Sequence, residues 1–198
     1  MKYYEYRPDA NRYAGLTIDR MQLASHPAFH HLANSTIHWS MATVFFKNEP
    51  LTSGWTPPQA DVFEDNPPRD GDFPSLSDFW RLPVMSARAW ECLSPLMNGD
   101  CEWLPIRHPT LVDYGIVHPM RELDCLDEER SELARYPDGP VMKVYRYAFK
   151  GDIIAGRHFF RLPRKSGGDL CLDEDFRRAV EANKLKGLLF KALQTTLV

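Results

Sequence analysis

Histidines are the first residues in this sequence that could support chemistry, because four of them lie close together, at positions 26, 30, 31 and 38. His26 and His30 would lie one turn apart on a helix, which is the spacing of many zinc-binding pairs. Pro27 disturbs that turn, and no glutamate follows His26 as it does in the HExxH motif. We therefore expect histidines of a partly exposed loop or helix start, with ring nitrogens bonded to backbone or water, and predict no metal site and no cofactor.

Carboxylates form two acidic clusters. The first contains Asp61, Glu64, Asp65, Asp70 and Asp72, and the second contains Glu122, Asp124, Asp127, Glu128 and Glu129. A pair of carboxylates can act as general acid and general base, which leaves a hydrolase open. Runs of this kind are also typical of a solvated face and of a surface that binds a basic partner. All three interpretations stay open for each cluster at this point.

Motifs for nucleophilic or nucleotide chemistry are missing from the sequence. It contains no GxSxG elbow, no GxxxxGK phosphate loop and no GxGxxG that opens a helix after a strand. Catalysis would therefore need residues dispersed along the chain. We predict that the chain is not an enzyme.

A basic and aromatic stretch near the C-terminus carries the alternative function, a nucleic-acid or regulatory binding module. Its members are Lys143, Tyr145, Arg146, Tyr147, Lys150, Arg157, His158, Phe159, Arg161, Arg164 and Lys165. In a strand, Tyr145, Tyr147 and Phe149 fall on one side, which is also typical of a core face. We expect core packing here.

The charge is divided unevenly along the chain. The net charge is −3, but residues 1–140 hold 12 basic and 21 acidic side chains, whereas residues 141–198 hold 12 basic and 6 acidic ones. The larger part is acidic, which disfavours a general nucleic-acid binder and favours a partner that is at least locally basic.

The composition is that of a globular protein, with 43% hydrophobic residues. No run approaches the roughly 20 apolar residues that a membrane span needs, and the first residues lack the apolar region of a secretory signal. The four cysteines form no CxxC pair, which is typical of reduced thiols. We expect a soluble, cytoplasmic protein that does not bind membranes.

Hydrophobic patterns predict an α+β fold with a mostly antiparallel sheet, two or three helices and a Pro-rich irregular connector. Helices are expected at residues 84–97, with Ser86 as the N-cap, and after Asp173, which would be the N-cap of a helix that ends before Gly187. A short helix is possible within residues 20–33. Strands are expected at residues 1–8, 37–46, 101–106, 111–117, 121–126, 141–149, 158–163, 170–172 and 188–190.

A change in amino-acid composition at residues 47–74 marks the candidate domain boundary. This segment contains six prolines and an excess of acidic residues, so we expect an irregular connector or arm. We predict an N-terminal region at residues 1–70 and an α+β domain at residues 71–198, with one continuous domain as the alternative.

Several short motifs occur in an order and spacing that resemble a known family. They are DFPSL at residues 72–76, LPVMS at 82–86, EWLP at 102–105, LDCLD at 123–127, FFRL at 159–162 and DFRRAVEA at 175–182 followed by LKGL at 185–188. Over about residues 70–190 the chain resembles immunity protein family 11 of bacterial polymorphic toxin systems.

The resemblance implies an intracellular antidote that binds the catalytic domain of a cognate antibacterial toxin and has no enzyme activity of its own. A nuclease domain is one candidate for that toxin. It assigns no functional residues. Because a nuclease cleft is positive, we expect one of the two acidic clusters to face the toxin, with an exposed tryptophan such as Trp55 as an anchor.

Overall fold

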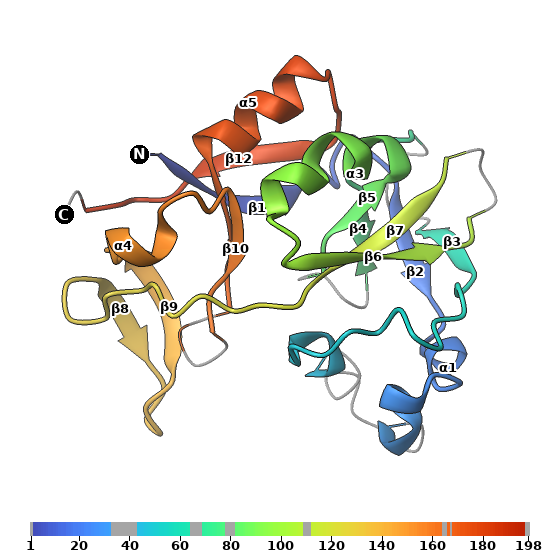
Figure 1. Cartoon of the computed structure of the whole chain (residues 1–198), viewed down its shortest axis with the longest axis horizontal. Coiled ribbons are helices and arrows are strands. Elements are labelled where there is room, and N and C mark those ends of the chain that lie inside the picture. Colours follow the sequence, from blue (N-terminus) through green and yellow to red (C-terminus); the bar gives the residue numbers. More distant parts are fainter. Residues whose placement is uncertain are drawn as a thin grey trace.

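The computed structural model describes residues 2–32, 43–63, 69–77, 82–108, 112–163, 166 and 168–196. Within these residues the chain has an α+β fold in which most strand pairs are antiparallel, as predicted. Figure 1 shows a body of helices and strands with a two-stranded hairpin at one end. In the described part of the chain, no helix is long and apolar enough to cross a membrane.

The N-terminal strand lies inside a sheet built from the C-terminal part of the chain. The strands are β1 (Tyr3–Pro8), β10 (Phe159–Arg161), β11 (Leu170–Asp173) and β12 (Leu188–Ala192), in the order β10-β11-β1-β12. Alternation in β1 explains this position, because Tyr3 packs into one core cluster while Tyr4 and Tyr6 pack into another. Both faces of β1 are therefore covered.

Helix α5 (Glu174–Ala182) covers one face of this sheet (Figure 1). The Asp173 carboxylate caps it by accepting the Phe176 N–H at 2.9 Å, and Phe176 and Val180 are buried beneath it. Gly187 follows the helix with a φ of 101°. The helix and its cap are confirmed, but it ends at Ala182, earlier than Gly187 suggested, and Lys184 takes the left-handed conformation next to its end, with a φ of 52°.

The other half of the body contains two three-stranded sheets. One has the order β5-β7-β6, from β5 (Val84–Ser86), β6 (Cys101–Ile106) and β7 (Tyr114–Pro119). The other has the order β3-β2-β4, from β2 (Gly15–Ile18), β3 (Ala60–Phe63) and β4 (Ser75–Leu76).

Helix α3 (Ala87–Leu93) confirms the predicted cap, because Ser86 Oγ accepts the Ala89 N–H at 3.1 Å. A 3₁₀ helix, η4 (Ser94–Met97), follows α3 directly and has Pro95 in its first turn. The predicted helix begins too early, since Val84 and Met85 belong to strand β5. The short elements α1 (Arg20–Leu23) and η1 (Pro27–Leu32) divide at Pro27, as the proline suggested.

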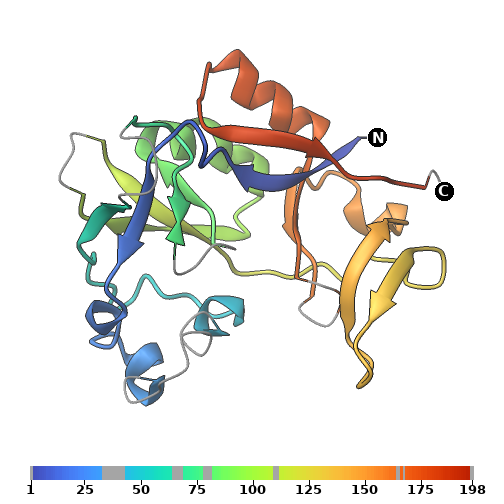
Figure 2. The same cartoon turned by 180° about the vertical axis from the view of Figure 1, so that it is seen from behind.

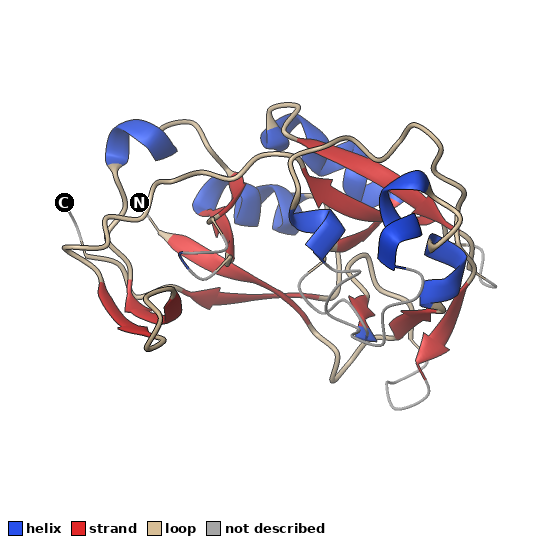
Figure 3. Cartoon of the chain, turned by 90° about the horizontal axis from the view of Figure 1, so that it is seen from below, coloured by secondary structure: helices blue, strands red, loops and turns tan. Residues whose placement is uncertain are grey.

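The hairpin consists of β8 (Glu132–Arg135) and β9 (Val141–Arg146), followed by the short helix α4 (Gly151–Ile154). Among the described strands, β8 and β9 pair only with each other. Seen from below, they stand at one end of the molecule (Figure 3). Their inner side chains Leu133, Val141 and Val144 pack with Phe149 and Phe160, which attaches the hairpin to the four-stranded sheet.

Four local predictions were wrong or incomplete. Residues 43–46 form a 3₁₀ turn, η2 (Thr43–Phe46), instead of a strand, and residues 37–42 lie outside the described part. Residues 121–126 make only isolated bridges, at Glu122 and Leu126. The connector at 47–74 contains strand β3, and β2 and β8 were not predicted.

Elements on the two sides of residue 70 share sheets and cores. Strand β1 pairs with β11 and β12, and β2 pairs in parallel with β4. One core cluster contains Leu16 and Phe45 together with Leu76 and Ile116. The division of the chain into regions at residues 1–70 and 71–198 stays a prediction, as does the alternative of one continuous domain.

Candidate functional site

The first acidic cluster lies at the end of the molecule that holds β2 and β3. Asp61 is exposed on β3, an edge strand of its sheet, and Asp70 is also exposed. Glu64 and Asp65 lie outside the described residues. Only Asp61 and Asp70 are therefore seen here as carboxylates available to a partner.

Asp72 is not available, because its side chain is buried and bonded within the fold. Its carboxylate accepts hydrogen bonds from Ser86 Oγ at 2.8 Å and from the Lys186 N–H at 2.7 Å, and Arg88 Nη2 lies 2.6 Å away. Asp72 joins three distant segments of the chain. The expectation that it faces a partner is corrected accordingly.

Trp55 also differs from the expected exposed anchor. Its indole Nε1–H donates to the Pro105 carbonyl at 2.8 Å, and its ring lies against His26 and Phe45. The side chain is partly buried against the core of this half. Trp55 therefore fixes the 47–58 segment on strand β6.

The second acidic cluster lies on an extended segment between β7 and β8. Leu123, Cys125 and Leu126 are buried, whereas Asp124, which lies between them in the sequence, is exposed. The Leu123 N–H donates to the Arg161 carbonyl and the Asp127 N–H donates to the Ala148 carbonyl, each at 2.8 Å. The backbone of the acidic segment is therefore held along β10 and beyond the end of β9.

Its carboxylates differ in what they already bind. Glu122 lies 3.7 Å from Arg161 Nε, and Asp127 accepts the Glu129 and Arg130 N–H groups at 3.2 Å. The Glu128 carboxylate accepts from Ser166 Oγ at 2.8 Å and from Arg135 Nη2 at 2.5 Å. Asp124 and Glu129 are the exposed members. These two are the best placed to meet a partner.

The basic and aromatic stretch does not form one continuous face. Phe159 and Arg161 are buried, and Arg161 Nη1 donates to the Phe45 carbonyl at 2.7 Å. Arg157 pairs with Asp100 at 2.8 Å, and His158 with Asp173 at 2.9 Å. The expected core packing is confirmed for Tyr147 and Phe149 but is wrong for Tyr145, which is 47% exposed.

The alternation of residues in the sequence could not predict the exposure of Tyr145, because the ladder between β8 and β9 has two irregularities. One of them lies next to the pair formed by Glu132 and Arg146. A bulge shifts the alternation of side chains. Strict alternation that assigns Met142 to the outer face assigns Tyr145 to the inner one, so no pattern in the sequence marked Tyr145 as exposed.

A buried pair, Glu102 and His118, could resemble catalytic machinery but serves the fold. Glu102 Oε1 lies 2.7 Å from His118 Nδ1, and the Glu102 carboxylate also accepts from Thr52 Oγ1 and from the Leu51 N–H. Burial raises the pKa of Glu102, but the hydrogen bonds from these three partners outweigh burial and lower it. Burial lowers the pKa of His118. The pair attaches the 51–52 backbone to the sheet of β6 and β7.

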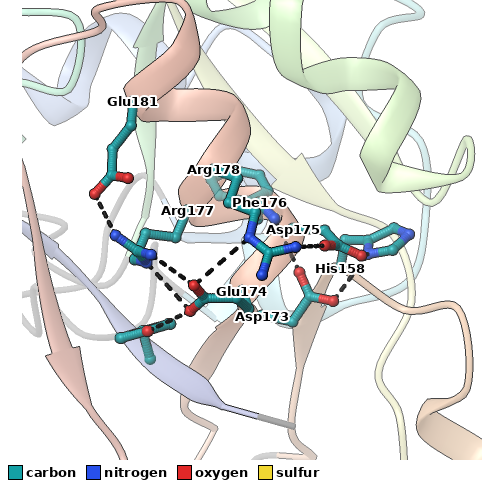
Figure 4. A network of polar contacts seen from close by, with 9 residues as sticks. His158, Asp173, Glu174, Asp175, Phe176, Arg177, Arg178 and Glu181 are labelled. Atoms are coloured by element: carbon teal, nitrogen blue, oxygen red, sulfur yellow. Dashed lines mark hydrogen bonds and ion pairs between the residues drawn. The ribbon is translucent and has the colours of Figure 1, made fainter.

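One group of side chains has the spacing of metal ligands. His158, Asp173 and Asp175 offer atoms within 4.8 Å of one another at the start of α5 (Figure 4). Asp173 is already used, since one oxygen caps the helix and the other bonds His158. An acidic helix start accounts for this arrangement without an ion.

The neighbouring contacts in Figure 4 are also structural. Glu174 accepts from Tyr4 Oη and from Arg177 Nη2, each at 2.5 Å, which ties α5 to β1. The hydrogen bonds from Arg177 and Tyr4 lower the pKa of Glu174 to about 2. This network stabilises the helix and its sheet.

His26 and His30 bond to backbone, as expected, but the expected exposure is wrong for His26, which is buried. His26 Nε2 lies 3.0 Å from the Leu51 carbonyl, and its Nδ1 accepts the Ala28 N–H at 3.1 Å. His30 Nε2 lies 3.1 Å from the Ser25 carbonyl. The side chain of His31 and all of His38 lie outside the described part.

Comparison with known proteins assigns the family. No curated protein matches the chain. The model of the immunity protein family Imm11 matches residues 56–195, which include α3, α5, the hairpin and the second acidic cluster. The match covers most of the chain and agrees with the resemblance found in the sequence motifs, so the chain belongs to the Imm11 immunity protein family.

Proposed function

We propose that this protein is a cytoplasmic antidote that binds a cognate antibacterial toxin with 1:1 stoichiometry and blocks it, as part of a polymorphic toxin system used in bacterial competition. The family match over residues 56–195 carries this proposal. Inhibition by binding needs no catalytic residues in the antidote. The buried Glu102–His118 pair and the helix cap at Asp173 have structural roles, which fits a protein without enzyme activity.

The charge of the chain supports a basic partner such as a nuclease domain. Residues 1–140 carry 12 basic and 21 acidic side chains. A nuclease binds phosphates in a positive cleft, and carboxylates placed against that cleft accelerate association and block substrate. The alternative, nucleic-acid binding by the C-terminal basic stretch, loses support because Arg157, His158 and Arg161 are bonded within the fold.

Calorimetric titration tests the proposal. The titrant is the C-terminal domain of the toxin-like protein encoded beside this chain's gene, with its catalytic residue replaced. We expect a 1:1 complex with nanomolar affinity, equivalent to about −12 kcal/mol. Absence of binding to a folded toxin domain overturns the proposal. Retention of the protein on a polyanion column at physiological salt would instead favour the nucleic-acid alternative.

A further inference from the structure

The hairpin carries most of the large hydrophobic side chains that are exposed. Among the described residues, four such side chains are exposed, and three of them are Tyr136 (52%), Met142 (50%) and Tyr145 (47%). The fourth is Met21 (55%), on α1 at the other end of the molecule (Figure 1). Tyrosine and methionine are enriched in protein interfaces, and exposed apolar side chains gathered on one element mark a binding surface.

The hairpin presents these side chains on a firm support. Val141 and Val144 of β9 are buried. The Tyr136 N–H donates to the Pro140 carbonyl at 2.9 Å across the turn between β8 and β9. The Tyr147 N–H donates to the Gln194 carbonyl at 2.7 Å, which ties the end of β9 to the C-terminal segment. The exposed residues therefore need little reorganisation on binding.

A groove adjoins the exposed side chains. It has a volume of about 450 Å³ and lies between β9 and the segment after β12, with Met142, Tyr145 and Leu193 among its lining residues. Lys143 Nζ lies 4.9 Å from the centre of the Tyr145 ring, so a cation covers part of that ring. The groove offers a recess for a side chain of a partner next to the exposed tyrosine.

The second acidic cluster is continuous with the hairpin. Ser131 Oγ donates to the Asp127 carbonyl at 2.6 Å and accepts the Ala148 N–H at 3.0 Å, and Glu128 bonds Arg135 of β8. Residues 122–146 contain seven acidic and four basic side chains. The groove itself is lined by side chains of both signs, with Lys143 and Lys191 as well as Glu5 and Asp169. The excess of negative charge comes from the segment that leads into the hairpin, where Asp124 and Glu129 are exposed, and this excess fits a partner that is basic around an apolar site.

We propose that this hairpin surface, defined as Tyr136, Met142 and Tyr145 with Asp124 and Glu129 at its rim, is where the toxin domain binds. The inference rests on the proposed function and assigns its binding site. The aromatic and methionine side chains supply the affinity, and the two carboxylates steer the approach of a basic toxin. A second copy of the chain is disfavoured as the occupant, because it would bring the same acidic rim against itself.

Matched aspartate substitutions test the site. We compare Met142→Asp and Tyr145→Asp with Met21→Asp, which places the same charge at a similarly exposed methionine away from the hairpin. Thermal unfolding checks that each variant folds, and calorimetry measures its affinity for the same toxin domain. We expect at least about 30-fold weaker binding for each hairpin variant and no more than about twofold for Met21→Asp.

The outcomes separate this inference from the proposed function. If the unmodified protein binds the toxin and all three variants bind equally well, the hairpin surface is overturned while the antidote function stands. If the unmodified protein does not bind, the function itself fails. Sedimentation of the protein alone provides a further check, because a dimer that Met142→Asp dissociates without a change in toxin affinity assigns the surface to self-association and overturns the proposal. Tyr136→Ala and Tyr145→Ala serve as milder variants should an aspartate disturb folding.

Discussion

The two acidic clusters lie on different segments of the fold and have different surroundings. Around the first, Asp72 and Trp55 bond within the fold, so the described carboxylates left exposed are Asp61 and Asp70. The second follows a segment that leads into a hairpin with exposed Tyr136, Met142 and Tyr145. Figure 2 shows the hairpin and the β2–β3 region far apart. Similar composition thus includes a structural carboxylate, Asp72, in the first cluster, whereas the second adjoins the surface that we propose for toxin binding.

The largest expected effect concerns the architectural role of Asp72. Asp72→Ala removes the acceptor of the Ser86 hydroxyl and of the Lys186 N–H, and leaves Arg88 without its carboxylate. We expect a loss of about 3 kcal/mol in the free energy of unfolding, measured by urea denaturation. Asp61→Ala, at an exposed position, should change it by less than about 0.5 kcal/mol. Equal effects of the two substitutions would contradict the distinction drawn within the first cluster.

Charge reversal compares the clusters as binding surfaces. Asp124→Lys with Glu129→Lys should slow association with the toxin domain about tenfold and reduce its salt dependence, because the steering charge is reversed. Asp61→Lys with Asp70→Lys should leave the rate within about twofold. Stopped-flow mixing at two salt concentrations measures both. If Asp61→Lys with Asp70→Lys slowed association more than Asp124→Lys with Glu129→Lys, the toxin would bind at the first cluster.

Acidic pH should lower the stability of the fold through the buried side chain of His118. Burial and the charge of Arg161 lower the pKa of His118 below 6.5, whereas the unfolded chain takes up that proton near 6.5. The unfolded state then binds more protons, so the free energy of unfolding falls as the pH drops below about 6.5, by at most about 1.4 kcal/mol per pH unit from this group. Glu102, whose pKa is lowered from 4.5, adds a further loss at more acidic pH.

The His118 contribution is measured by urea denaturation at several pH values. His118→Gln should reduce the slope below about pH 6.5 without abolishing it, because burial also lowers the pKa of His108. An NMR titration of the unmodified protein gives an independent readout, in which the pKa of the His118 ring should lie below 6.5. A His118 ring that titrates at or above 6.5 would refute this assignment.

The smallest effect is expected at Trp55. Trp55→Phe keeps most of the ring packing against His26 and Phe45 but removes the hydrogen bond to Pro105. We expect about 1 kcal/mol lower stability with unchanged toxin affinity. A large loss of affinity in a variant of normal stability would restore Trp55 as the anchor.

The features of the fold that were predicted correctly depend on local sequence signals. Ser86 and Asp173 are N-caps because their side chains act within a few residues, and Pro27 and Pro95 divide helical segments for equally local reasons. The family motifs were also local. These features need no knowledge of which distant segments meet.

Long-range contacts explain what the sequence could not predict. Asp72 looks like any residue of an acidic arm until Lys186 and Ser86 are brought to it. Residues 121–126 alternate like a strand but make only isolated bridges with Arg161 and Phe149. Tyr145 follows an irregular ladder and is exposed instead of packing with Tyr147. The hairpin surface depends on the last of these tertiary details, the irregular pairing of β8 and β9.

Hydrogen exchange of the protein alone and in complex with the toxin domain locates the binding surface. We expect slower exchange in residues 124–146 of the complex, where the second acidic cluster and the hairpin lie, and unchanged exchange in β3. Protection confined to residues 60–72, with the hairpin unchanged, would contradict this expectation and place the toxin at the first cluster.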